Sequence, residues 1–161
     1  MFGCVYCYCV YLCGKFHLNK RIMNREIVFR GKRLDNDEWL YGDLMHDNQG
    51  GCYIYPLDAE NLYTENKVAT DTVGQFAGLV DKKGVKIFEG DIVTMMRKPE
   101  KRRHYELVRH VVTCNNVCDW VFKSLSNDVL GLVMANHSDF DSYKFEVIGN
   151  IYDNPELLST K

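Results

Sequence analysis

The sequence has no apolar run that approaches the roughly 18 to 20 residues of a membrane-spanning helix, so we expect no transmembrane segment. It has only 3 prolines, no internal repeat and no low-complexity tract. It also lacks a strong charge imbalance, since the net charge of −2 weakens the case for a general polyanion binder. The 161 residues are 46% hydrophobic and 26% charged, which favours one globular domain, or two small subdomains that share a core.

Motifs of the common catalytic and nucleotide-binding sites are missing as well. The sequence contains no G-x-x-x-x-G-K-[ST], G-x-G-x-x-G, H-E-x-x-H or G-x-S-x-G motif, and no C-x-x-C pair outside its first 22 residues. We therefore predict that the protein is not an enzyme and that it needs no cofactor.

The first 22 residues differ in composition from the rest and hold four of the seven cysteines, at positions 4, 7, 9 and 13. Four thiolates are enough for a tetrahedral zinc site, but no folded loop separates them into two pairs, so we expect no metal there. The segment also lacks the charged start and the cleavage site of a secretory signal, which favours a cytoplasmic protein without disulfides. We predict that residues 1–22 are a leader or translated upstream sequence outside the fold, and that Met23 is the biological start.

From Met23 onward, apolar and polar residues alternate with the period of two that is typical of β-strands. Ile27 and Phe29, for example, fall on one face of the first run, and Val28 and Arg30 fall on the other. Clusters of Asn, Asp, Ser and Gly separate the runs. The extended runs are residues 25–34, 39–44, 52–57, 68–80, 85–88, 92–96, 105–114, 117–123, 129–135 and 143–152.

This spacing predicts an all-β fold, with one terminal turn at 154–160 as its only clear helical element. Residues 58–67 lack a convincing period, so we place a subdomain boundary near them. The prediction is a meander at 23–71 followed by a small barrel-like part at 72–158.

The stretch "GLVDKKGVKIFEGDIV" at 78–93 predicts two sharp changes of direction. Asp81 to Gly84 is a turn in which Gly84 takes a left-handed conformation. Gly90 forms a second corner, where Asp91 hydrogen-bonds local amides before the next strand leaves in a new direction. Corners of this kind close small β-barrels.

Three segments resemble, in order and spacing, the signature blocks of the YopX family of phage and prophage proteins. They are "REIVFRGKRLDNDEWLYGDLMHD" (25–47), "TVGQFAGLVDKKGVKIFEGDIV" (72–93) and "FEVIGNIYDNPELL" (145–158). The resemblance covers nearly all of residues 24–158, although the leader and residues 97–143 follow no family pattern. It implies an all-β fold with two small subdomains, a phage or prophage origin and self-association, and it supplies no catalytic activity.

The strongest polar cluster is a basic segment between two predicted strands. Its six cations would bind phosphate oxygens of a nucleotide or nucleic acid, with a strong dependence on salt. The alternative is a solvated loop, since Glu100 and Glu106 dilute the charge. The cations are Arg97, Lys98, Lys101, Arg102, Arg103 and Arg109.

His137, Asp139 and Asp141 offer a second set of possible metal ligands. Two carboxylates at i and i+2 point in opposite directions in a strand, and these residue types also make ordinary loops, so we expect no metal. Trp39, Trp120 and the tyrosines are interpreted as core and cross-strand partners.

Two roles remain, both of them binding without catalysis. In the first, the chain is a phage or prophage accessory protein that self-associates and binds a host or phage macromolecule. In the second, it is an anti-defence protein that sequesters a nucleotide signal in a pocket. A nucleic-acid-binding module is a weaker alternative to both.

Overall fold

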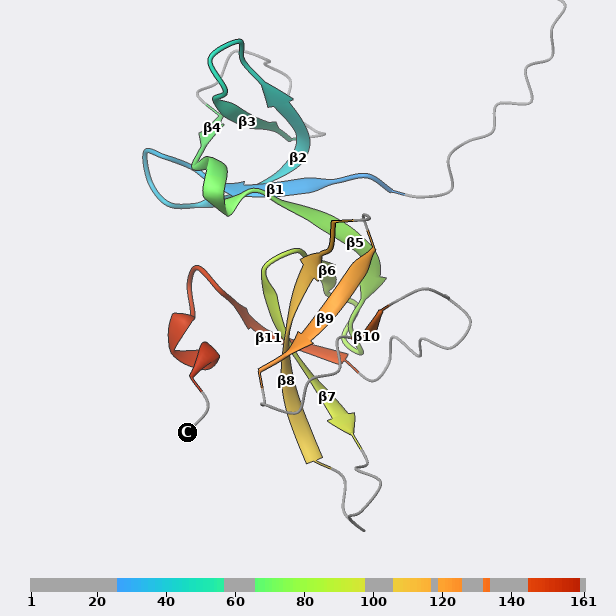
Figure 1. Cartoon of the computed structure of the whole chain (residues 1–161). Helices are drawn as coiled ribbons and strands as arrows, with labels where there is room; N and C mark the ends of the chain where they lie inside the picture. Colours follow the sequence, from blue (N-terminus) through green and yellow to red (C-terminus); the bar gives the residue numbers. More distant parts are fainter. Residues whose placement is uncertain are drawn as a thin grey trace, which may run out of the picture.

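The computed structural model describes residues 26–56, 66–97, 106–116, 119–125, 132–133 and 145–159 (Figure 1). In these residues the chain forms eleven strands, arranged as two antiparallel sheets, and two short 3-10 helices, and it contains no α-helix. The all-β prediction is therefore confirmed. The part of the chain that the structure describes contains no helix long and apolar enough to cross a membrane.

The first sheet has the strand order β4-β3-β2-β1-β5-β6. Strands β1, β2, β3 and β4 pair in sequence, which confirms the predicted meander. The Asp47 carboxylate closes the β2–β3 turn by accepting hydrogen bonds from the Gln49 and Gly51 amides. The strands are β1 (Phe29–Lys32), β2 (Trp39–His46), β3 (Cys52–Tyr55), β4 (Lys67–Val68), β5 (Gly74–Val80) and β6 (Lys86–Phe88).

Residues 68–80, predicted as one extended run, are instead divided by the 3-10 helix η1 (Thr70–Thr72). The Thr72 hydroxyl explains the break, because it donates a hydrogen bond to the Ala69 carbonyl and accepts one from the Lys32 amide. A threonine that bonds its own local backbone competes with strand pairing at that point. Strand β5 then begins at Gly74 and pairs with β1.

The second sheet has the strand order β10-β9-β8-β7-β11, and all its pairings are antiparallel. In the described residues this sheet does not close on itself, because β10 and β11 remain at its two edges. The β5–β6 hairpin lies against one of its faces. The strands are β7 (Asp91–Arg97), β8 (Glu106–Cys114), β9 (Trp120–Ser124), β10 (Leu132–Val133) and β11 (Phe145–Asn150).

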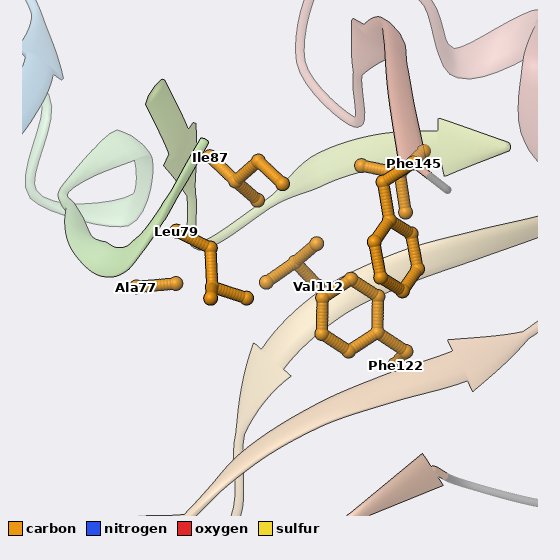
Figure 2. Packing of buried hydrophobic residues seen from close by; sticks show 7 residues of the cluster. Ala77, Leu79, Ile87, Val112, Phe122 and Phe145 are labelled. Carbon is orange, nitrogen blue, oxygen red and sulfur yellow. The ribbon is translucent and has the colours of Figure 1, made fainter. Parts of the chain in front are cut away.

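The largest core cluster lies between the β5–β6 hairpin and the second sheet. Figure 2 shows side chains from both meeting there. The rings of Phe122 and Phe145 are stacked, with their centroids 4.6 Å apart. The hairpin thus belongs to the first sheet by hydrogen bonding and to the second by packing. The buried members are Ala77, Leu79, Ile87, Val93, Val112, Phe122 and Phe145.

The two corners expected between residues 78 and 93 are present, with Gly84 at φ +81° and Gly90 at φ +82°. Both values lie in the left-handed region that favours glycine. The Gly90 amide donates to the Val112 carbonyl, and the Gly90 carbonyl accepts from the Ile151 amide. The corner therefore joins β7, β8 and the segment after β11.

The terminal turn predicted near the end of the sequence is the 3-10 helix η3 (Pro155–Leu158). Three sequence-based predictions concern segments outside the described residues: the leader at 1–22, the loop of His137, Asp139 and Asp141, and most of residues 58–67. The division into 23–71 and 72–158 stays a prediction.

Candidate ligand-binding cavity between the two sheets

A buried ion pair joins the first sheet to the start of the second. Arg30 on β1 places its Nη2 2.7 Å from Oδ1 of Asp91, the first residue of β7. The two residues are 5% and 2% exposed. Burial raises the pKa of Asp91, and both the Arg30 guanidinium and the Phe88 amide oppose that rise.

The hydrogen bonds of this pair leave part of Arg30 without an acceptor. The Asp91 Oδ2 accepts from the Phe88 amide at 2.7 Å, so the carboxylate meets Arg30 through its other oxygen. The Arg30 Nη2 also donates to the Glu89 carbonyl at 3.0 Å. The Arg30 Nε is buried and has no hydrogen-bond partner among the described residues. Most buried N–H groups in proteins have a partner, so this one needs an explanation.

Aromatic rings hold the Arg30 guanidinium in place. Its Cζ lies 4.7 Å from the ring centroid of Trp39 and 5.0 Å from that of Phe88. Both distances are typical of cation–π contacts. Tyr41 meets the Phe88 ring in an edge-on arrangement with a centroid distance of 5.5 Å.

A cavity of about 400 Å³ lies beside this pair, between the two sheets. That volume falls in the roughly 300–1,000 Å³ range of small-ligand sites. Apolar and aromatic side chains make up most of the wall, together with a few polar groups. From the first sheet, the lining residues are Val28 just before β1, Arg30 of β1, Tyr41 of β2, Val85 just before β6, and Lys86 and Phe88 of β6. From the second sheet they are Asp91 of β7 and Val147, Gly149 and Asn150 of β11.

The turn after β11 fixes the first sheet against the second. The Asp153 carboxylate accepts hydrogen bonds from Lys32 Nζ at 2.7 Å, from Trp39 Nε1 at 2.7 Å and from Asn150 Nδ2 at 2.8 Å. The Asn150 and Lys32 bonds are the main reason that its pKa falls to about 2. The Tyr152 hydroxyl adds a bond to the Asp71 carbonyl at 2.7 Å. We call these contacts the Asp153 junction.

The family model described as "YopX protein" matches residues 28–159. The chain belongs to the YopX family. Every residue that lines the cavity lies inside the matched range, as does the whole Asp153 junction. No curated protein matches the chain. Among solved structures, the chain is similar to the crystal structure of protein EF1440 from Enterococcus faecalis, with 24% identity, 84% of this chain and 99% of that chain covered, and a TM-score of 0.49.

The basic segment of this YopX-family chain is only partly described. Arg97 ends β7 opposite Glu106 in the register. Arg109 lies on β8, where its Nη1 donates to the Leu157 carbonyl at 2.7 Å and its Nη2 to the Ser159 carbonyl at 3.2 Å. Arg109 thus holds the C-terminal turn, and a phosphate would have to compete with these bonds. Lys98, Lys101, Arg102 and Arg103 lie outside the described residues, and their phosphate-binding role stays a prediction.

Sequence reasoning missed the cavity and the role of Arg30. One signal was present, because the alternation in β1 puts Arg30 on the same face as Val28, and a cation on a buried face needs a partner. Asp91 was assigned only to local amides, which is correct for its bond to Phe88. Trp39 was interpreted as a cross-strand partner, but its indole N–H also reaches Asp153, which lies far away in the sequence.

Proposed function

We propose that this YopX-family chain is a non-enzymatic binding protein that holds a small ligand in the cavity between its two sheets. The cavity itself carries the proposal. It holds about 400 Å³ between the two sheets, and apolar and aromatic side chains share its wall with the buried Arg30–Asp91 pair. This size, and an apolar wall with a few fixed polar groups, are typical of small-ligand sites.

The polar groups of the wall support binding rather than catalysis. Asp91 has both oxygens engaged, Lys86 pairs with Glu26 at 2.5 Å, and the Asn150 amide bonds within the Asp153 junction. The described residues that line the cavity include no Ser, Thr, Cys or His. The wall thus offers a shaped, largely apolar surface with a few polar groups, which are the usual elements of a recognition site.

Among the roles predicted from the sequence, the cavity favours capture of a small molecule. In a phage or prophage protein that acts in the bacterial cytoplasm, this is the anti-defence role, in which the chain sequesters a host nucleotide signal. The alternative of nucleic-acid binding depends on the basic segment, and Arg109 is already engaged by the C-terminal turn.

Self-association, with binding of a host or phage macromolecule, is the second part of the proposal. One observation favours it: Met96 and Leu107 lie directly opposite each other on β7 and β8 and are 51% and 65% exposed. A pair of large apolar side chains at the end of a hairpin is suited to contact with a second copy.

Native mass spectrometry tests both parts. The protein is incubated with the small-molecule fraction of a bacterial extract, and the mass of each species gives the number of copies and any bound ligand. We expect wild-type protein to carry a ligand that Val85→Trp loses. Val85 lies in the cavity wall and is 47% exposed, so the larger ring should take up cavity space without disturbing the core.

The matched control is Val80→Trp, which changes a similarly exposed valine of β5 outside the lining, and it should keep the ligand. A ligand retained equally by both variants, or none bound by wild type, would refute the cavity as the site. A purely monomeric spectrum would refute self-association.

A further inference from the structure

We propose that two copies of this chain associate through the outer face of the β2–β3–β4 meander, where Asp43 of each copy meets Lys67 of the other. This inference rests on the self-association in the proposed function and adds a contact surface to it. The surface lies on the first sheet and is separate from the Met96–Leu107 pair on the second. Its side-chain composition and its arrangement of charge lead to the inference.

The β2–β3–β4 meander has one buried face and one outer face. On the inner face, buried side chains of β3 and β4 form a core cluster with partly buried side chains of β2. Because side chains alternate along a strand, the residues between these members point to the outer face. Their accessibility agrees, since each is exposed or partly exposed. The outer-face residues are Tyr41, Asp43 and Met45 of β2, Tyr53 and Tyr55 of β3, and Lys67 of β4.

The strand register places tyrosines at the centre of this face and opposite charges on its two sides. Asp43 is paired with Tyr55, and Met45 with Tyr53. On the other side of β3, Tyr53 is paired with Lys67. Tyrosine and methionine are enriched in the cores of protein interfaces, and charged groups belong to the rim. The outer face has this arrangement.

The central ring of Tyr53 is already ordered in the single chain. Its hydroxyl donates a hydrogen bond to the Asp47 carboxylate at 3.1 Å. The Lys67 Nζ lies 5.8 Å from the centroid of its ring. Ordering a side chain on association costs free energy, so a ring that is already held in place makes the contact less costly.

The charges of the outer face complement those of a second copy. Neither Asp43 nor Lys67 is in an ion pair among the described residues. A twofold axis that passes through the middle of the face brings Asp43 of one copy to Lys67 of the other, and symmetry repeats the contact on the opposite side. The tyrosines of β3 then meet at the centre. A face with charges of one sign would instead repel its own copy.

The test is a charge reversal. Sedimentation velocity over a concentration series measures the association of wild-type protein, of Asp43→Lys, of Lys67→Asp and of the variant that carries both changes. Each single reversal sets like charges opposite each other twice per pair of copies, and should weaken association by at least about tenfold. The double variant restores opposite charges and should associate within about threefold of wild type. Both positions are exposed, so we expect unchanged folds, which circular dichroism checks.

The matched controls are Asp119→Lys and Lys123→Asp. They make the same changes of charge at exposed positions beside and in β9 of the second sheet. Both should associate as the wild-type protein does, because neither position belongs to the outer face of the meander.

Each contrary outcome is distinct. Association that the single reversals leave unchanged would overturn this surface and leave self-association standing. Weakening by a single reversal, without recovery in the double variant, would overturn the Asp43–Lys67 contact. A wild-type protein that is monomeric at every concentration would overturn self-association and this inference together. The cavity is decided separately, by whether Val85→Trp loses the ligand taken from the extract.

Discussion

At the scale of single residues, the Arg30–Asp91 pair shows why a buried ion pair is hard to replace one partner at a time. Each ion loses its hydration on burial, and mutual attraction repays that cost only while both are present. Here the same two residues also satisfy the Phe88 amide and the Glu89 carbonyl. The pair is therefore part of the backbone hydrogen bonding at the β6–β7 corner.

Replacing one partner should be costly. We expect Arg30→Met to lower the free energy of unfolding by roughly 3–5 kcal/mol, because it leaves the Asp91 carboxylate buried without a counter-charge. The double variant Arg30→Met with Asp91→Asn should lose less than the sum of the two single losses, since it buries neither charge and the oxygen of the new amide side chain can still accept from Phe88. Urea unfolding of the four proteins, followed by circular dichroism, measures this coupling. Additive losses would mean that the two side chains do not stabilise each other.

At the scale of elements, the turn between β5 and β6 is attached to β11 by one buried carboxylate. Asp81, which is 4% exposed, accepts from the Lys83 amide at 2.7 Å and the Val85 amide at 2.9 Å within the turn. Its other oxygen accepts from the Val147 amide at 3.2 Å. The Lys82 amide donates to the Phe145 carbonyl at 3.0 Å, so the turn covers the edge of β11.

The variant Asp81→Asn separates these two tasks. Its Oδ1 can keep the turn closed, while its amide nitrogen would face the Val147 amide, donor against donor. We expect a loss of about 1–3 kcal/mol in the free energy of unfolding. Hydrogen exchange should speed up at Val147 much more than at Val85. Equal acceleration at both amides would show that the turn itself opens, contrary to this assignment.

The same turn shows what the sequence can predict. The corners at Gly84 in this turn and at Gly90 between β6 and β7 were predictable because glycine stands where a left-handed residue is needed. The strands were predictable because alternation is a local property. The cavity was not predictable in this way. It depends on Arg30 meeting Asp91, 61 positions later, and on Asp153 meeting Lys32 and Trp39 of the first sheet. Local patterns contain no information on such distant pairings. The η1 break was missed because the Thr72 hydroxyl bonds its own backbone within a β-branched run.

At the scale of the whole molecule, the two sheets are held together mainly by polar contacts on one side of the cavity and by apolar packing beyond it. The Asp153 junction connects β1 and β2 with the turn after β11. Glu146 adds a second connection, since it pairs with Lys82 at 2.6 Å and Lys83 at 2.7 Å. Both connections depend on carboxylates that must stay ionised.

This arrangement makes stability depend on acid pH. Hydrogen bonds from Lys82 and Lys83 lower the pKa of Glu146 from 4.5 to about 2, and those from Asn150 and Lys32 lower the pKa of Asp153 from 3.8 to about 2. As the pH falls from about 4.5 to about 2, the unfolded chain therefore binds protons that the folded chain does not, and the free energy of unfolding decreases. Above pH 4.5 both contributions are fully present. The pKa of Asp81 is lowered too, while the raised pKa of Asp91 acts in the opposite direction.

Urea midpoints measured at several pH values between 5.5 and 2.5 should fall steadily in wild-type protein. The double variant Glu146→Gln with Asp153→Asn should start from a lower midpoint at pH 5.5 and lose less on acidification, because the two strongest titrating contacts are gone. The matched control replaces the exposed carboxylates of Asp43 and Glu156, which lie outside these contacts, and should keep the wild-type slope. Parallel losses of stability in the double variant and wild type would mean that neither the Asp153 junction nor the Glu146 ion pairs are the source of the pH dependence. Protonation of Glu146 and Asp153 would then have no consequence for how the sheets are held together.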